Sequence, residues 1–243
     1  MAKLKTRSSS KYLIFGLHVL IFIIDLFSTY YDIFNVDIGQ KGFKSKFMFL
    51  TVWNICLQTL YFGFCVVSDL AELAALQHKC LRNWRDTFHS TIAFPVGTFV
   101  VLLFWGLYSI DRELVYPKAL DDIIPSWLNH LLHTTPLPFL ITDKYLVYHV
   151  HPPRLKGMIK ASSIALIYIV WILFIAFYDN IWVYPILKTL SVHGRAVFLI
   201  FCMVIFGLLY ILGEKTSSAF WKQEPATTNL QKPEVISTHK KYL

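Results

Sequence analysis

Hydrophobic residues along the chain are concentrated in long stretches that are separated by short polar segments. Each stretch comes close to the roughly 20 residues that a helix needs to cross about 30 Å of hydrocarbon. A chain inside a bilayer must satisfy its own backbone hydrogen bonds, and a helix does so within one segment. We therefore predict an all-α, polytopic membrane helix bundle with about six transmembrane helices, over residues 12–31, 47–68, 91–110, 124–142, 161–178 and 196–213.

The composition agrees with this pattern. Hydrophobic residues make up 56% of the 243 residues and charged residues only 16%, and the mean hydropathy is +0.51. A soluble domain has about a quarter of its residues charged. We expect a cytosolic N-terminal arm over residues 1–11, one transmembrane domain over residues 12–215, and a disordered cytosolic tail, rich in Pro, Thr, Lys and Glu, over residues 216–243.

Basic residues are divided unevenly between the two predicted sides of the membrane. Most of the 23 Lys and Arg residues fall in the N-terminal arm, the second and fourth connecting loops and the tail. Because basic loops stay in the cytosol, both termini are predicted to be cytosolic. The net charge of +8 then reflects this asymmetry and attraction to anionic lipid headgroups, and we expect no nucleic-acid partner.

The fourth predicted span is unusually polar. It contains Asn129, His130 and His133, followed by Pro136 and Pro138. Ionisable groups in hydrocarbon are costly unless they are paired or line a polar cavity, so an intramembrane histidine marks a functional site by default. Asn129 and His133 are one helical turn apart, and the two prolines interrupt the helix just beyond them.

The second predicted span carries a matching polar face. Three polar residues, Thr51, Asn54 and Gln58, are separated by three and then four positions, which places them on one side of a helix. A hydroxyl beside an imidazole can act as a nucleophile activated by a general base, and the second and fourth spans enter from the same predicted side. Thr51 could therefore meet His133, although a threonine in a membrane helix commonly bonds its own backbone instead.

The first span holds another buried pair, His18 and Asp25, seven residues apart on one helix face. Two interpretations remain open for this pair. Asp25 could orient a histidine on another helix, or the pair could make a hydrogen bond between helices without any role in chemistry.

Metal binding is the alternative function of the histidines. His130 and His133 supply only two ligands from one helix, and His149 and His151 belong to a predicted cytosolic loop. The histidine clusters of membrane di-iron enzymes are absent, and the four cysteines show no metal-binding or disulfide spacing. We therefore expect neither a metal ion nor a cofactor.

Several short motifs together resemble the androgen-induced gene / androgen-dependent TFPI-regulating protein family, over about residues 10–220. They are Lys46-Phe-Met-Phe-Leu-Thr51, Ala93-Phe-Pro-Val-Gly-Thr-Phe-Val, Phe104-Trp, Asp111-Arg-Glu-Leu-Val-Tyr-Pro-Lys, Ile124-Pro-Ser-Trp-Leu-Asn-His-Leu-Leu-His-Thr, Trp182-Val-Tyr-Pro and Tyr210-Ile-Leu-Gly-Glu-Lys.

The resemblance implies a multi-pass threonine hydrolase that cleaves fatty acid esters of hydroxy fatty acids, with such a lipid as the substrate and the membrane as its setting. The family's nucleophile falls on Thr51 and its catalytic histidine on His133. Asn129 and His130 belong to the motif without a role that can be carried over. Developing charge on the ester oxygen needs hydrogen-bond donors, and Asn54 and Asn129 are the candidates.

A non-catalytic function is the alternative to the esterase. A lipid-binding, transport or regulatory membrane protein would show the same spans, and turnover of a branched fatty acid ester separates the two classes. For the location, the chain ends in Lys240-Lys241-Tyr-Leu, which resembles the dilysine signal of endoplasmic reticulum membrane proteins. We expect that membrane, with the cell membrane as the alternative.

Overall fold

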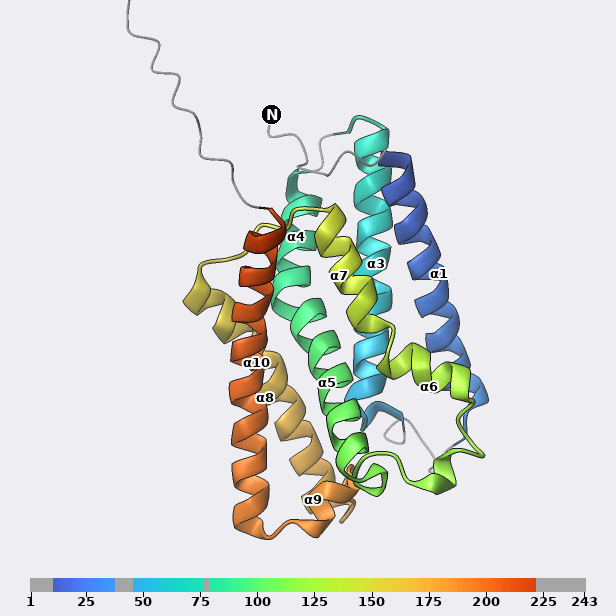
Figure 1. The fold of residues 1–243 in the computed structure, drawn as a ribbon, viewed down its shortest axis with the longest axis vertical. Coiled ribbons are helices and arrows are strands. Elements are labelled where there is room, and N and C mark those ends of the chain that lie inside the picture. Colours follow the sequence, from blue (N-terminus) through green and yellow to red (C-terminus); the bar gives the residue numbers. More distant parts are fainter. Residues whose placement is uncertain (1–10, 38–45, 77–78, 222–243) are drawn as a thin grey trace, which may run out of the picture.

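The structure, a computed structural model, describes residues 11–37, 46–76 and 79–221 (Figure 1). Its main helices are α1 (Lys11–Asn35), α3 (Leu50–Leu73), α4 (Lys79–Phe88), α5 (Phe94–Ile110), α6 (Ser126–His133), α7 (Pro136–Leu146), α8 (Arg154–Tyr178), α9 (Pro185–Thr189) and α10 (Val192–Phe220). A π-helical turn, η1 (His89–Ala93), joins α4 to α5, and the 3-10 turns η2 (Arg112–Leu114) and η3 (Lys118–Leu120) follow α5.

Within these ranges, five helical stretches are long and apolar enough to cross a membrane. They are α1, α3, the continuous stretch Lys79–Ile110, α8 and α10, and they run roughly along the long axis of the molecule (Figure 1). They coincide with the first, second, third, fifth and sixth predicted spans. The prediction of an all-α, multi-pass membrane protein is confirmed.

The fourth predicted span, residues 124–142, is not one helix. Helix α6 ends at His133 and α7 begins at Pro136. Pro136 and Pro138 have no backbone N–H to donate, and a proline ring clashes with the carbonyl one turn earlier. The backbone N–H groups of the two residues after His133 both bond to the His130 carbonyl, at 2.8 and 3.1 Å, which closes α6. With 8 and 11 residues, α6 and α7 are each too short to span a bilayer.

The last helix runs further than predicted. Helix α10 continues to Phe220, so residues 216–220 are helical and not part of a disordered tail. Trp221 is buried, and its indole N–H donates to the carbonyl of Lys144 at 2.9 Å, which ties the end of α10 to α7. The arm before residue 11 and the tail from residue 222, with Lys240 and Lys241, lie outside the described residues.

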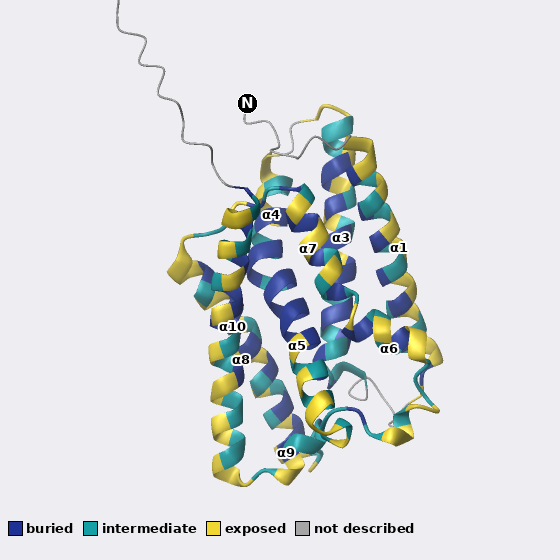
Figure 2. Cartoon of the chain, viewed as in Figure 1, coloured by how far each residue is buried: buried dark blue, intermediate teal, exposed yellow. Residues whose placement is uncertain are grey.

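The bundle turns polar side chains inward and apolar side chains outward. On α1, His18 and Asp25 are buried, whereas Leu20 and Phe27 are more than half exposed on the outer face. Exposed apolar residues also follow the outer faces of α8 and α10, while the stretch through α5 is covered on most sides (Figure 2). This arrangement suits a protein whose outer solvent is lipid, because only the interior then offers partners for polar groups.

The bundle has two distinct ends. Helix α1 begins and α10 ends at one end, which we call the terminal end, and the short helix α9 lies at the opposite end, which we call the α9 end (Figure 1). Helix α3 starts near the α9 end and rises to the terminal end (Figure 1).

Candidate active site

Thr51 is the second residue of α3, and the start of that helix is held by two tyrosines. The backbone N–H of Leu50 donates to the hydroxyl of Tyr168 at 2.9 Å and to that of Tyr184 at 3.1 Å. The two hydroxyls also bond to each other at 2.8 Å, and that of Tyr168 donates to the carbonyl of Met48. These contacts satisfy an N–H group that lacks a helical partner and fix the position of Thr51.

His133 closes α6 and points one ring nitrogen at Thr51. Its Nε2 lies 3.1 Å from Thr51 Oγ1, and its Nδ1 lies 2.8 Å from Asn129 Oδ1 and 3.1 Å from the Asn129 carbonyl. A carbonyl oxygen only accepts, so Nδ1 must carry the hydrogen of the neutral ring. The lone pair on Nε2 therefore faces the Thr51 hydroxyl, which is the arrangement of a general base and its nucleophile.

Aromatic residues of α5 hold the histidine in place. The ring of Phe104 stacks on that of His133 with centroids 3.7 Å apart and planes at 14°. The indole N–H of Trp105 donates to the His133 carbonyl at 2.9 Å, which satisfies a carbonyl at the end of α6. No spacing rule in the sequence marks these two residues, because they reach His133 from another helix.

The other predicted site residues divide into two groups. Asn129 orients His133 through its side-chain oxygen. His130 is exposed, bonds to Thr134 at 3.1 Å and stacks on Trp105. Both contacts are made with Thr134 and Trp105, and not with Thr51 or the His133 ring.

Asn54 lies one turn beyond Thr51 and is fully buried. Its Oδ1 accepts a hydrogen bond from Gln58 at 2.9 Å, and the Gln58 amide also donates to the carbonyl of Ala93 at 3.0 Å. Its Nδ2 has no partner among the described residues. Asn54 therefore offers a positioned side-chain oxygen and an amide donor that is free to bind something else.

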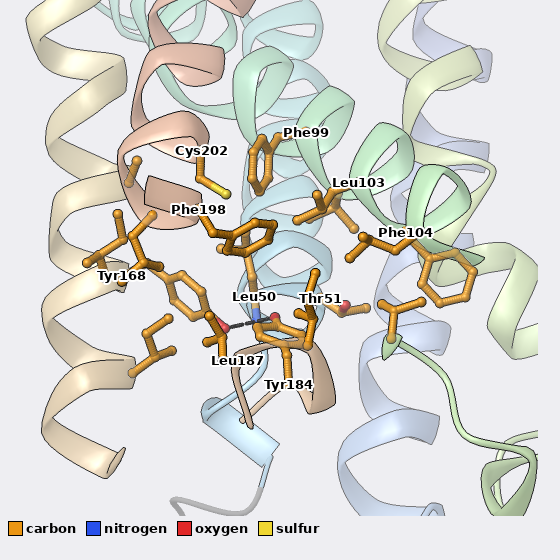
Figure 3. A pocket seen from close by; sticks show the side chains of 18 of the residues that line it. Leu50, Thr51, Phe99, Leu103, Phe104, Tyr168, Tyr184, Leu187, Phe198 and Cys202 are labelled. Atoms are coloured by element: carbon orange, nitrogen blue, oxygen red, sulfur yellow. Dashed lines mark hydrogen bonds between the residues drawn. The ribbon is translucent and has the colours of Figure 1, made fainter. Parts of the chain in front are cut away.

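Thr51 lies at the wall of an apolar pocket between α3, α5, α8 and α10 (Figure 3). Leu50 and Phe99 line it from α3 and α5, Tyr168 from α8, and Phe198 and Cys202 from α10. Its surface is almost entirely hydrocarbon, so the pocket suits an apolar group beside the Thr51 hydroxyl.

His18 makes hydrogen bonds between helices, which is the second of the two interpretations left open for His18 and Asp25. It bonds to Asp69 and Asp143, on α3 and α7, near the terminal end. Asp25 is buried with one carboxylate oxygen unpartnered among the described residues. The residue at His133 Nδ1 is Asn129, so an acid from α1 does not orient this histidine.

These features define a multi-pass helical membrane protein in which a partly buried threonine pairs with a buried histidine at an apolar pocket. The chain belongs to the FAR-17a/AIG1-like protein family, which it matches over residues 13–218. The family resemblance predicted from the sequence is thereby confirmed.

Individual relatives agree with this assignment. The chain is 34% identical to human androgen-induced gene 1 protein over 207 residues, covering 81% of this chain and 87% of that one. It is 35% identical to human androgen-dependent TFPI-regulating protein over 205 residues, covering 79% and 89%. A membrane protein of Schizosaccharomyces pombe is 25% identical over 184 residues, covering 73% and 78%. No solved structure matches.

Proposed function

We propose that this protein is an integral membrane lipid esterase that hydrolyses the internal ester of fatty acid esters of hydroxy fatty acids. Thr51 is the nucleophile and His133 the general base. The observation that carries the proposal is the 3.1 Å contact between Thr51 Oγ1 and His133 Nε2, made at the wall of an apolar pocket.

In the first half of the reaction, His133 Nε2 takes the Thr51 proton while Oγ1 attacks the ester carbonyl carbon. When the tetrahedral intermediate collapses, the ester C–O bond breaks, and the protonated His133 gives its proton to the departing alkoxide. The hydroxy fatty acid leaves, and the other acyl chain stays bonded to Thr51. The Asn129 oxygen favours this step because it stabilises the ring N–H as positive charge forms on the imidazole.

In the second half, water replaces the alcohol. His133 takes a proton from the water, whose oxygen attacks the acyl-threonine carbonyl. The bond to Oγ1 breaks, the proton returns to Thr51, and a free fatty acid is released. The protein is then ready for another ester, and no external oxidant, reductant or metal is consumed.

The negative charge that develops on the carbonyl oxygen needs a donor, and Asn54 is the better of the two candidates. The oxygen of Asn129 is engaged with His133, whereas Asn54 Nδ2 is buried without a partner among the described residues. An amide donor that is already buried and oriented stabilises an oxyanion at little cost of reorganisation.

The substrate class follows from the pocket and the membrane. A fatty acid ester of a hydroxy fatty acid has two long hydrocarbon chains around one internal ester. Its chains partition into lipid, so the ester can approach the bundle laterally from the bilayer. The aliphatic and aromatic lining of the pocket accommodates one chain and holds the ester at Thr51.

The test is turnover by the purified full chain in detergent or lipid nanodiscs, with release of fatty acid from such an ester measured by mass spectrometry. Thr51→Ala and His133→Ala should each lower kcat by at least about 100-fold. Thr189→Ala, an exposed threonine at the same end of the bundle, is the matched control and should keep wild-type turnover.

Wild-type turnover in both site variants would contradict the proposed pair. If the wild-type protein binds the ester in the pocket but never cleaves it, the non-catalytic lipid-binding class replaces the esterase.

A further inference from the structure

A second cluster of buried titratable residues lies toward the terminal end of the bundle and takes no part in the proposed esterase reaction. Its centre is Asp143, near the end of α7, which is fully buried. Three imidazoles face this carboxylate: His18 from α1, His89 from η1 and His149 from the loop after α7, and none of them is exposed. We call these four residues the Asp143 cluster. Tyr61, whose hydroxyl bonds to Asp143, lies ten residues beyond Thr51 on α3, which corresponds to roughly 15 Å.

His18 and His149 are each held between two carboxylates. His18 Nδ1 lies 2.6 Å from Asp69 and its Nε2 lies 3.0 Å from Asp143. His149 Nδ1 lies 3.2 Å from Asp86 and its Nε2 lies 3.0 Å from Asp143. A neutral imidazole has only one N–H, so each ring would turn a lone pair toward a carboxylate unless a second proton or a metal ion comes between them.

At His18 a second proton on the ring accounts for both contacts, because each is a direct hydrogen bond to a carboxylate. At His149 the adjacent ring of His89 makes a second proton less favourable. His89 stacks on His149 with centroids 4.0 Å apart and planes at 8°. Protonating His149 would place a positive charge against this ring and would still leave His89 without a hydrogen bond.

His89 is the least satisfied group in the cluster. Neither of its ring nitrogens has a hydrogen-bond partner among the described residues, although the side chain is completely buried. Its Nε2 lies 3.8 Å from Asp143 Oδ2, too far for a hydrogen bond but on the same side as His149 Nε2. A buried polar group in this state commonly marks the place of a water molecule or an ion.

We propose that His89 Nε2, His149 Nε2 and the Asp143 carboxylate bind a divalent transition-metal ion, Zn²⁺ before others. The three donor atoms lie within 4.8 Å of one another, so small inward shifts bring them to ligand distances of about 2.0–2.2 Å. Two imidazoles and a carboxylate suit Zn²⁺, whereas Ca²⁺ and Mg²⁺ prefer oxygen ligands throughout. The expectation of no metal, drawn from sequence spacing, would then be wrong.

The surroundings of His149 match those of a metal-bound histidine. Such a ring usually donates its other N–H to a carboxylate, which fixes the tautomer and strengthens the ligand. Asp86 takes this place at His149 Nδ1, and Arg85 in turn donates to Asp86 at 2.9 Å. The ion would join α7, the following loop and the turn between α4 and α5, and so fix the terminal end of the bundle independently of Thr51.

The experiment measures metal in the purified full chain, prepared with an affinity tag that contains no histidines. Elemental analysis should find about one Zn²⁺ per chain. After stripping with a chelator, one equivalent of added Zn²⁺ should rebind and raise Tm by about 5 °C or more. Co²⁺ in the same site should give visible absorption bands, a test that needs no variant.

The variants His89→Gln and His149→Gln should lose the ion, while Thr51→Ala should keep it, so that this result does not depend on esterase activity. His151→Gln is the matched control. His151 lies two residues from His149, outside the proposed ligand set.

Two results would overturn the proposal. One is a wild-type protein that purifies with less than about a tenth of an equivalent of metal and rebinds neither Zn²⁺, Mn²⁺, Fe²⁺ nor Co²⁺. The other is a wild-type protein with metal that His89→Gln and His149→Gln both retain. In either case a water molecule or a proton would satisfy the Asp143 cluster.

Discussion

In the proposed mechanism, Asn129 decides how well His133 can act as a base. With its Nδ1 hydrogen directed at the Asn129 oxygens, the ring presents an unprotonated Nε2 to Thr51. Without this contact the ring could adopt the other tautomer, which would place a hydrogen on Nε2 and block proton removal. In the proposed reaction, the same oxygens would also stabilise the imidazolium that forms.

We therefore predict that Asn129→Ala lowers kcat by about 10- to 100-fold and leaves KM nearly unchanged. Steady-state kinetics on the fatty acid ester measure both constants. His130→Gln is the control, because His130 is exposed and bonds to Thr134, and its kcat should stay within about twofold of wild type. Equal losses in the two variants would mean that Asn129 acts only through the fold of α6.

The role that we propose for Asn54 is different and arises only in the transition state. Asn54→Ala removes the unpartnered Nδ2 donor, and we predict a fall in kcat of about 100- to 1000-fold with little change in KM. Thermal unfolding of the same variant serves as the control for loss of structure, since Asn54 Oδ1 also binds Gln58. A variant that folds normally and keeps kcat within about threefold would remove Asn54 from the mechanism.

At the scale of helices, close approach between α8 and α10 depends on a glycine. A Cβ built on Gly157 would lie 1.9 Å from the ring of Tyr210, whose buried hydroxyl donates to the Pro152 carbonyl at 2.6 Å. Tyr210 therefore occupies the space that a side chain at residue 157 would need. Gly106 on α5 has no atom within 4 Å of such a Cβ.

Gly157→Ala should consequently destabilise the protein by about 1–3 kcal/mol, because it forces Tyr210 out of its site. Gly106→Ala is the matched substitution within a helix, and we expect it to be neutral or to stabilise the protein by about 0.5–1 kcal/mol. Thermal unfolding in the same detergent compares the two. A Gly157 variant as stable as the Gly106 variant would show that α10 can move away from α8 without cost.

The helices themselves were largely predictable, and their internal contacts were not. Hydropathy and length located five spans because each is a local property of one segment. The break before Pro136 follows from proline chemistry, yet a pattern of apolar residues alone predicts one continuous span over 124–142. Phe104-Trp was one of the motifs of the family resemblance, but the stacking of Phe104 on His133 could not be predicted, because it depends on how α5 packs beside α6.

The Asp143 cluster escaped prediction because its members also meet only in the folded chain. His149 belongs by sequence to a loop and was expected at the cytosolic surface, but that loop folds inward and leaves the side chain with no exposed area. Its neighbour His89 comes from a distant segment, and the π-helical turn that carries it has no marker in the sequence. Thr51 and His133 were easier to find, because polar residues at helical spacing stand out in apolar spans.

For the whole molecule, orientation and location stay predictions. With both termini in the cytosol, as the basic residues predict, the terminal end faces the cytosol and Thr51 lies toward the opposite side of the membrane. The division into domains stays a prediction, and the dilysine ending lies outside the described residues.

The Lys240→Ala/Lys241→Ala variant should move the protein from the endoplasmic reticulum to the cell surface, because retrieval requires the two lysines on a cytosolic tail. Surface biotinylation of intact cells measures the shift, with Lys222→Ala as a control outside the ending. An unchanged distribution would show that the dilysine ending does not retain the protein, and a wild-type protein already at the surface would favour the cell membrane.

Acylation of Thr51 with the help of His133 is the central step of the proposed mechanism, and peptide mass spectrometry after treatment with an acylating lipid probe tests it most directly. We predict one adduct, on the peptide and side chain of Thr51, that is absent from Thr51→Ala and at least about 100-fold slower to form in His133→Ala. Labelling of another residue at the wild-type rate, or equal labelling of Thr51 in wild type and His133→Ala, would contradict the mechanism.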